Sequence, residues 1–109
     1  MFELNERVAI VTGAGSPKGI GRTIALTLAK QGAAVVIADL NTAGIGDTVR
    51  AVKKTGGKAL GVTLDVTSKK SNEAMVEKVL AEYGRIDILV NNAGISQKFR
   101  RVLFRSGHC

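Results

Sequence analysis

The fold is decided by residues 8–21, which read VAIVTGAGSPKGIG. An apolar run, Val8 to Val11, leads into a turn that contains four glycines, and a segment with the spacing of an amphipathic helix follows. Glycine lets the chain turn sharply after a strand and lets the next helix pack closely against that strand. The stretch is therefore expected to form a strand, a tight turn and the start of a helix.

The rest of the chain repeats this alternation. Further apolar runs lie at residues 34–38, 59–64 and 86–90, and most are continuous, which is typical of strands buried on both faces of a parallel sheet. Apolar residues at helical spacing predict helices over residues 21–31, 42–55 and 71–83. The sequence thus predicts an α/β fold: an incomplete Rossmann-type parallel sheet of four strands in the order 3-2-1-4, with helices on both faces.

Glycines also mark features of the expected helices. Gly32 is expected to end the first helix, and Gly56-Gly57 the second. Gly44 and Gly46 lie inside the second helix and should each weaken it by up to about 1 kcal/mol relative to alanine. The third helix has one apolar stripe that is expected to face the core, made of Met75, Val76, Val79, Leu80 and Tyr83.

Composition and charge exclude several classes of protein. Hydrophobic residues make up 45% of the 109 residues, which excludes a disordered chain, and the one cysteine, Cys109, has no partner for a disulfide or a cysteine-rich metal site. No apolar stretch reaches the roughly 18–20 residues of a membrane helix, and residues 1–7 are too polar for a signal peptide. Of the net charge of +7, four basic residues lie after Ser96, and the basic residues before it are scattered. Aromatic residues are 4%, so nucleic acid is not an expected partner. A cytoplasmic domain without a metal is expected.

Polar and glycine residues recur at the ends of the predicted strands. Gly13, Asp39, Asp65 and Asn91 stand 26 residues apart, each just after an apolar run. The carboxyl ends of parallel strands lie along one edge of the sheet, and open α/β sheets bind ligands there. One such residue means only that a loop begins, but four of them, one in a glycine turn, predict a binding edge.

The turn from Thr12 to Gly21 has the composition of a phosphate-binding loop. Its glycines let the backbone approach a pyrophosphate, and the amides at the start of the helix then meet the negative charge. It is not a Walker A loop, because Lys18 and Gly19 stand where that motif needs Gly and Lys. Since an acid, Asp39, follows at the end of the second strand, the pattern predicts a dinucleotide site.

Asp39 bears on which dinucleotide binds. A carboxylate there accepts hydrogen bonds from ribose hydroxyls and repels a 2′-phosphate, which favours NAD over NADP. Lys18 argues for NADP if it reaches that phosphate, and it is otherwise a solvated loop lysine. Asp65 either meets the adenine amino group or accepts backbone amides within Asp65-Val66-Thr67 at the start of a helix.

These residues resemble the short-chain dehydrogenase/reductase family, especially 3-oxoacyl-carrier-protein reductases and related alcohol or sugar dehydrogenases. The resemblance covers about residues 3–97 and makes residues 1–97 the dinucleotide-binding part of a Rossmann domain. It is carried by the glycine turn, Asp39, Asp65-Val66-Thr67, and Tyr83 to Asp87 leading into Asn91-Asn92-Ala93-Gly94. It implies an oxidoreductase that transfers hydride between NAD(P) and a carbonyl or alcohol substrate.

The resemblance also implies contacts with the cofactor. The pyrophosphate would be lined by Gly13, Ser16, Gly19, Ile20 and Gly21, with Lys18 beside the second motif glycine. The remaining contacts would be Asp39 and Leu40 with the adenosine ribose and adenine, Asp65 and Val66 with adenine, and Asn91, Ala93 and Gly94 with the nicotinamide ribose. Asn91-Asn92 would also tie neighbouring strands together. The family has three residues between its first two motif glycines, whereas five separate Gly13 from Gly19, so the phosphate contacts should differ.

No catalytic residue is expected in this chain. The resemblance implies a tyrosine acid/base, a lysine four residues later that lowers its pKa, a serine and an asparagine, all beyond the Asn-Asn-Ala-Gly strand. The one tyrosine here, Tyr83, has Asp87 four residues later and lies on the core stripe of a helix. The chain by itself is therefore expected to be inactive. The alternative is a non-catalytic dinucleotide-binding or sensor module.

Residues 98–109 depart from the family pattern. Arg101 to Ser106 resemble a translated sequencing adapter, so we expect an irregular segment or an artefactual gene end; the alternative is a basic amphipathic tail, which is too short to form a stable isolated helix. The fourth strand would then be an uncovered apolar edge, and the family's oligomer contacts would be missing. Marginal solubility and weak NAD binding are expected.

Overall fold

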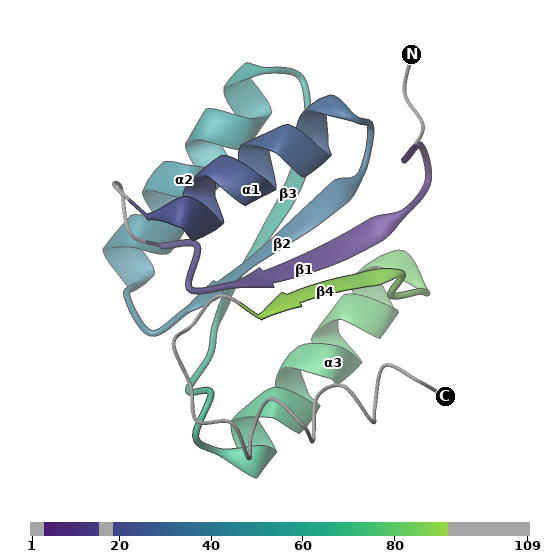
Figure 1. Ribbon diagram of the computed structural model, residues 1–109. Helices are drawn as coiled ribbons and strands as arrows, with labels where there is room; N and C mark the ends of the chain where they lie inside the picture. The colour runs from purple at the N-terminus through teal and green to yellow at the C-terminus, as the bar shows by residue number, and fades with distance from the viewer. Residues whose placement is uncertain (1–3, 16–18, 92–109) are drawn as a thin grey trace.

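The computed structural model describes residues 4–15 and 19–91, and strands alternate with helices along this part of the chain (Figure 1). The strands are β1 (Val8–Thr12), β2 (Ala34–Asp39), β3 (Lys58–Thr63) and β4 (Ile88–Asn91). The helices are α1 (Ile20–Lys30), α2 (Thr42–Lys54) and α3 (Lys69–Tyr83). Neighbouring strands are parallel, in the order β3-β2-β1-β4, so the predicted fold and strand order are confirmed.

The sheet lies between two layers of helix, with α1 and α2 on one face and α3 on the other (Figure 1). Side chains of a strand point alternately to its two faces. On β2, Val35 and Ile37 therefore pack with residues of α1 and α2, whereas Val36 and Ala38 pack with α3. Both faces of β2 are buried, which is why its sequence is a continuous apolar run.

The glycines end the helices as predicted. Gly32 has a φ of +99°, and its N–H donates to the Ala29 carbonyl while the Ala33 N–H donates to the Leu28 carbonyl. These two bonds form a Schellman motif, in which a residue with positive φ closes the helix. Gly56, with a φ of +85°, ends α2 in the same way.

The stripe of α3 is only partly buried, and here the prediction was wrong. Met75 and Val79 are buried, but Val76 is 38% exposed and Leu80 is 45% exposed. In the described part of the chain, α3 is the one helix on its face of the sheet, so it contacts the strands along a narrow line. Residues one position to the side of that line remain in contact with solvent.

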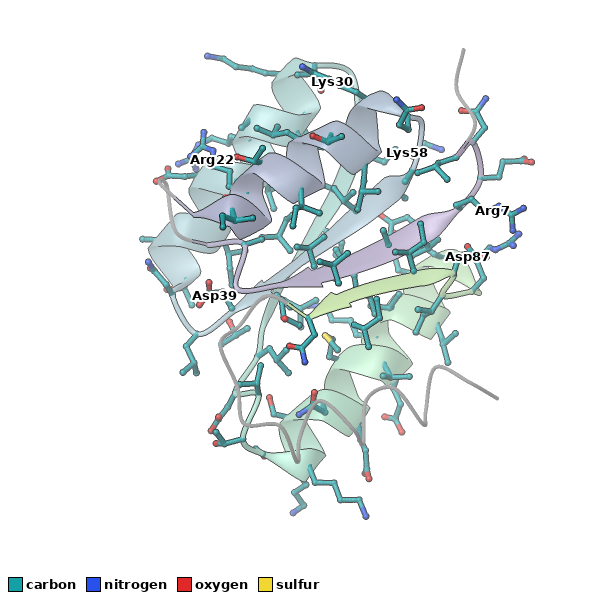
Figure 2. All side chains as sticks on the ribbon, in the orientation of Figure 1. Arg7, Arg22, Lys30, Asp39, Lys58 and Asp87 are labelled. Carbon is teal, nitrogen blue, oxygen red and sulfur yellow. The ribbon has the colours of Figure 1, made fainter. Side chains whose placement is uncertain are left out.

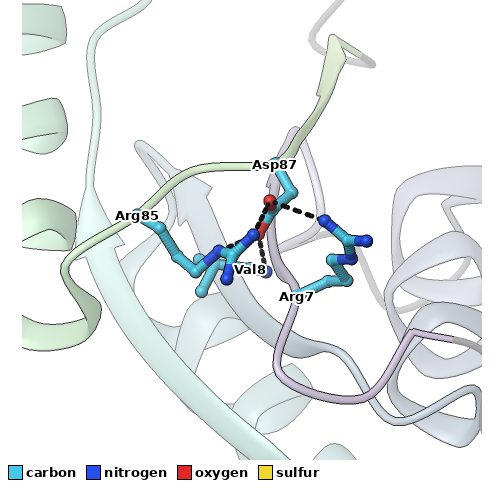
Figure 3. A network of polar contacts seen from close by, with 4 residues as sticks. All are labelled: Arg7, Val8, Arg85 and Asp87. Atoms are coloured by element: carbon cyan, nitrogen blue, oxygen red, sulfur yellow. Dashed lines mark hydrogen bonds and ion pairs between the residues drawn. The ribbon is translucent and has the colours of Figure 1, made fainter.

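Asp87 ties β4 to β1 at the amino edge of the sheet (Figure 3). Its carboxylate accepts the Val8 N–H at 2.8 Å and two guanidinium bonds from Arg85 at 2.9 and 2.7 Å, and Arg7 adds an ion pair at 3.4 Å. The Arg85 bonds and the Val8 amide hold the pKa of Asp87 down to about 2. β4 begins at Ile88 and not at the predicted residue 86, although the Asp87 N–H also donates to the Val8 carbonyl at 2.9 Å.

Candidate functional site

The four residues spaced by 26 positions lie along one edge of the sheet, as predicted. The Gly13 N–H donates to the Ala38 carbonyl at 2.9 Å, at the ends of β1 and β2. The next strand is joined there too, because the Leu64 N–H, just before Asp65, donates to the Asp39 carbonyl at 2.8 Å. Asn91 is the last residue of β4 and pairs in register with Thr12. The carboxyl edge of the sheet therefore brings together the glycine turn at Gly13 and the side chains of Asp39, Asp65 and Asn91.

The glycine turn approaches β2 and α2 so closely that no side chain fits between them. Gly13 has a φ of +69°, which L-residues rarely adopt. A Cβ added to Gly15 would lie 2.7 Å from the Asp39 Oδ2, and one added to Gly44 would lie 1.8 Å from the Gly15 carbonyl oxygen. Gly15 and Gly44 are thus required by the packing of the turn, a role that the sequence alone did not assign to them.

The carboxylate of Asp39 holds the turn to the end of β2. Its Oδ2 accepts the Gly15 N–H at 2.9 Å and its Oδ1 accepts the Asn41 N–H at 3.1 Å. An ionised carboxylate has about four acceptor positions, so two remain for further donors such as sugar hydroxyls. Asp39 is half-buried and lies at the end of the sheet away from Arg7 and Asp87 (Figure 2). The residue can therefore position the turn and accept a ligand at the same time.

Asp65 shows the second of its two predicted roles. Its Oδ1 accepts the Thr67 N–H at 3.0 Å and the Thr67 hydroxyl at 2.6 Å, and these bonds lower the pKa of Asp65. This is a local turn ahead of α3, whose N-cap is Ser68. The Oδ2 takes no part in these bonds, and the predicted contact with adenine stays a prediction.

Two large apolar residues are exposed at this edge. Ile20, the first residue of α1, is 71% exposed, and Leu40, which follows β2, is 63% exposed. Both belong to the predicted cofactor contacts, and an apolar surface beside polar acceptors suits a ligand with an aromatic base. Gly19 is the N-cap of α1 and supplies no side-chain cap, whereas Asn41 and Ser68 cap α2 and α3 with their side chains.

Asn91 links β4 to β1 through its side chain. Its Oδ1 accepts the Thr12 hydroxyl at 3.2 Å, which confirms the strand-tying role predicted for this residue. Its Nδ2 is buried and has no hydrogen-bond partner among residues 4–15 and 19–91. A buried N–H group without an acceptor is costly, so this group fits a ligand oxygen at the carboxyl edge.

Gly21 and Val66, also predicted contacts, are buried and half-buried respectively.

Four of the predicted contacts lie outside the described residues, namely Ser16, Lys18, Ala93 and Gly94. The expectations for residues 98–109 lie outside them too. Over the described ranges there is no cluster of His, Cys, Asp and Glu that could hold a metal, and no helix long and apolar enough to cross a membrane.

Tyr83 lies away from the candidate site. It is the last residue of α3, packs against the core cluster with Met75 and Val79, and lines an open hollow at the amino edge together with Arg7 and Lys58. Burial raises the pKa of Tyr83, whereas an acid/base tyrosine needs a lowered pKa. The structure thus places the described tyrosine in a structural position, as predicted.

Comparison with known proteins agrees with this geometry. The family model described as short chain dehydrogenase matches residues 7–105. The chain belongs to the short chain dehydrogenase family. Members of this family generally use NAD(P) as cofactor, and the related proteins named below are dehydrogenases.

Individual relatives cover most of the chain. It is 49% identical over 92 residues to the cis-4-hydroxycyclohexanecarboxylate dehydrogenase of Sinomonas cyclohexanicum, covering 84% of this chain and 36% of the relative. It is 41% identical over 93 residues to the 7alpha-hydroxysteroid dehydrogenase of Escherichia coli strain K12, covering 85% of this chain and 36% of that enzyme. The chain therefore spans little more than a third of the length of these dehydrogenases.

Solved structures give the same fold. A short chain dehydrogenase from Mycobacterium smegmatis superposes with a TM-score of 0.81 at 36% identity, over 87% of this chain and 40% of that one. A hydroxysteroid dehydrogenase from Escherichia coli superposes with a TM-score of 0.77 at 39% identity, over 81% of this chain and 37% of that one. The match therefore spans about two fifths of each of these longer chains.

Proposed function

We propose that this short chain dehydrogenase binds NAD in preference to NADP along the carboxyl edge of its sheet, and that it is the cofactor-binding part of an oxidoreductase for secondary alcohols and ketones. The observation that carries the proposal is the place of Asp39. Its carboxylate lies at the end of β2, bonded to the Gly15 amide of the glycine turn, with acceptor positions left for ribose hydroxyls. A 2′-phosphate at the same place would meet a like charge.

The other residues of the edge fit the remaining parts of a dinucleotide. The start of α1 at Gly19 and Ile20 would supply backbone amides to a pyrophosphate. Leu40 and Ile20 offer apolar surface to the base. The Nδ2 of Asn91, which has no partner within residues 4–15 and 19–91, offers a donor to the second ribose. When bound, a nicotinamide dinucleotide supplies or accepts the hydride for the substrate.

The relatives support a carbonyl or alcohol substrate. By their names, they act on a hydroxy acid with a six-membered ring and on a hydroxysteroid, both of which carry a secondary alcohol on a ring. The described residues place no tyrosine at the carboxyl edge beside Asn91, because Tyr83 packs against the core cluster at the end of α3. We therefore propose that this chain by itself binds the dinucleotide and turns over no substrate.

The test is a pair of titrations with NADH and NADPH, followed by the fluorescence of the reduced nicotinamide. The unaltered chain should bind NADH more tightly. Asp39→Asn removes the charge and keeps an oxygen that can accept the Gly15 amide, so it separates cofactor choice from the shape of the turn. Two charges about 4 Å apart repel by about 1–4 kcal/mol near a protein surface, so the preference for NADH should fall by about tenfold or more.

Several outcomes would contradict the proposal. Equal binding of NADH and NADPH by the unaltered chain would remove the role given to the Asp39 charge, and so would a stronger preference for NADH in Asp39→Asn. Absence of binding for both dinucleotides would refute the site itself. Turnover of a cyclic secondary alcohol by the isolated chain would show that the acid/base chemistry is present in it.

A further inference from the structure

We propose that Thr48 of α2 is a positioning residue for dinucleotide binding, because its hydroxyl holds the glycine turn in place through a hydrogen bond from α2. This inference rests on the proposed function, and it concerns a residue that lies outside the predicted contacts with the cofactor. Thr48 is fully buried and its hydroxyl donates to the Ala14 carbonyl oxygen at 2.7 Å, across 34 residues of sequence.

Three backbone groups of Ala14 and Gly15, in the first half of the glycine turn, are held by the segment from Asp39 to Thr48. Thr48 binds the Ala14 carbonyl, the Asp39 carboxylate accepts the Gly15 N–H, and the Gly15 carbonyl packs against the Cα of Gly44. The Ala14 carbonyl and the Gly15 N–H belong to one peptide plane and the Gly15 carbonyl to the next, so two successive planes are restrained, and together they set the direction in which the chain leaves Gly15. The placement of the amides at the start of α1, Gly19 and Ile20, depends on that direction, and amides at a helix N-terminus suit a phosphate.

The Thr48 hydroxyl is used for the glycine turn and not for a hydrogen bond within its own helix, α2. Threonine in a helix usually turns its hydroxyl back to a carbonyl of the preceding turn, as Thr27 does toward Thr23 at 2.9 Å. The Thr48 hydroxyl bonds instead with the turn between β1 and α1. The residue lies on the apolar stripe of α2, three positions after Ile45 and four before Val52, where an aliphatic side chain would satisfy packing. The hydroxyl is therefore explained by the turn and not by the helix.

The experiment compares Thr48→Val, which keeps the shape and removes the hydroxyl, with Thr48→Ser, which keeps the hydroxyl. Thr55→Val is the matched control, because the Thr55 hydroxyl also bonds a carbonyl, that of Val52 at 2.7 Å, at the far end of α2. The Kd for NADH and for adenosine is measured for each variant. NADH spans the turn, whereas adenosine carries no phosphate and meets only the Asp39 side of the edge.

Thr48→Val should weaken NADH binding about tenfold, the size of one lost buried hydrogen bond, and leave adenosine binding within twofold. Thr48→Ser and Thr55→Val should bind both probes within twofold of the unaltered chain. If Thr48→Val does not fold, Thr48→Ala and Thr48→Ser, which differ from each other only by the hydroxyl, make the same comparison.

The inference is overturned if the hydroxyl-free variants bind NADH as the unaltered chain does. It is also overturned if adenosine binding falls as far as NADH binding, because a general loss of structure would then explain both. Failure of the unaltered chain to bind NADH would instead refute the proposed function. Amide hydrogen exchange at Gly15 in the ligand-free chain adds an independent readout: exchange should be faster in Thr48→Val and unchanged in Thr55→Val.

Discussion

Two glycines inside one helix should respond to the same substitution in opposite directions. Gly44 and Gly46 both lie in α2, and helix propensity alone predicts that alanine at either position stabilises the protein by about 0.5–1 kcal/mol. The surroundings differ. A Cβ at Gly44 would lie 1.8 Å from the Gly15 carbonyl oxygen, whereas a Cβ at Gly46 would meet only the Arg50 Nη1 at 3.4 Å.

The size of the change in the free energy of unfolding depends on whether the neighbour that the new Cβ contacts can move. The Arg50 guanidinium ends a flexible, exposed side chain, so Gly46→Ala should keep nearly the full gain of about 0.5–1 kcal/mol. The Gly15 oxygen belongs to the backbone of the turn, whose amide is held by Asp39. Relieving that contact requires α2 or the turn to shift, and overpacking of this kind costs about 1–3 kcal/mol or more. Gly44→Ala should therefore destabilise the protein by about 1–2 kcal/mol after the propensity gain.

Urea denaturation followed by circular dichroism measures both variants in the same buffer. For a domain of this size, about 1 kcal/mol corresponds to a change of roughly 4–8 °C in melting temperature, so the two variants should separate clearly in thermal melts as well. Gly44→Ala should also weaken NADH binding, because the turn moves with it. An increase in the free energy of unfolding for Gly44→Ala, equal to that of Gly46→Ala, would refute the reasoning from close approach.

The remaining predictions concern acid stability and the core. Asp87→Asn should reduce the loss of folding free energy that the protein suffers in acid. The pKa of Asp87 is lowered to about 2 in the folded protein, so the ionised carboxylate stabilises the fold above the unfolded pKa of 3.8, and this stabilisation is lost as the pH falls toward 2. Urea midpoints at pH 5 and pH 2 check this, and an equal drop for the variant and the unaltered chain would contradict it. Ile37→Ala, in the fully buried centre of β2, should lower the free energy of unfolding by about 2–5 kcal/mol, whereas Leu40→Ala at a 63% exposed position should change it by less than about 0.5 kcal/mol. A similar cost for the two substitutions in urea titrations would mean that the core is not packed as described.

The sheet could be predicted from the sequence because local signals agree with the global fold. Continuous apolar runs marked each strand, and Gly32 and Gly56 marked helix ends that need positive φ. The carboxyl edge was predictable as well, since residues after parallel strands must meet there, and Asp39 and Asn91 do lie at its strand ends.

What could not be predicted depends on close contacts between distant segments. The approach of Gly44 to Gly15 is set by how α2 packs, and no local pattern separates it from Gly46, which was expected to weaken the helix equally. Thr48 could have been noticed as a hydroxyl on an apolar stripe, although its partner, Ala14, is not readable from the sequence. The stripe of α3 was predicted too wide, because helical spacing does not say how much of the sheet a helix will cover.

The clamp at Asp87 has a consequence for the order of folding. β1, β2 and β3 follow one another closely along the chain, but the hydrogen bond from Val8 to Asp87 spans 79 residues. Closing so long a loop costs more entropy than the nearer pairings, so β4 is expected to join a sheet whose first three strands have already assembled. The strand that joins last, β4, is then held by the Asp87 carboxylate, and acid near pH 2 should release β4 before β1, β2 and β3 separate.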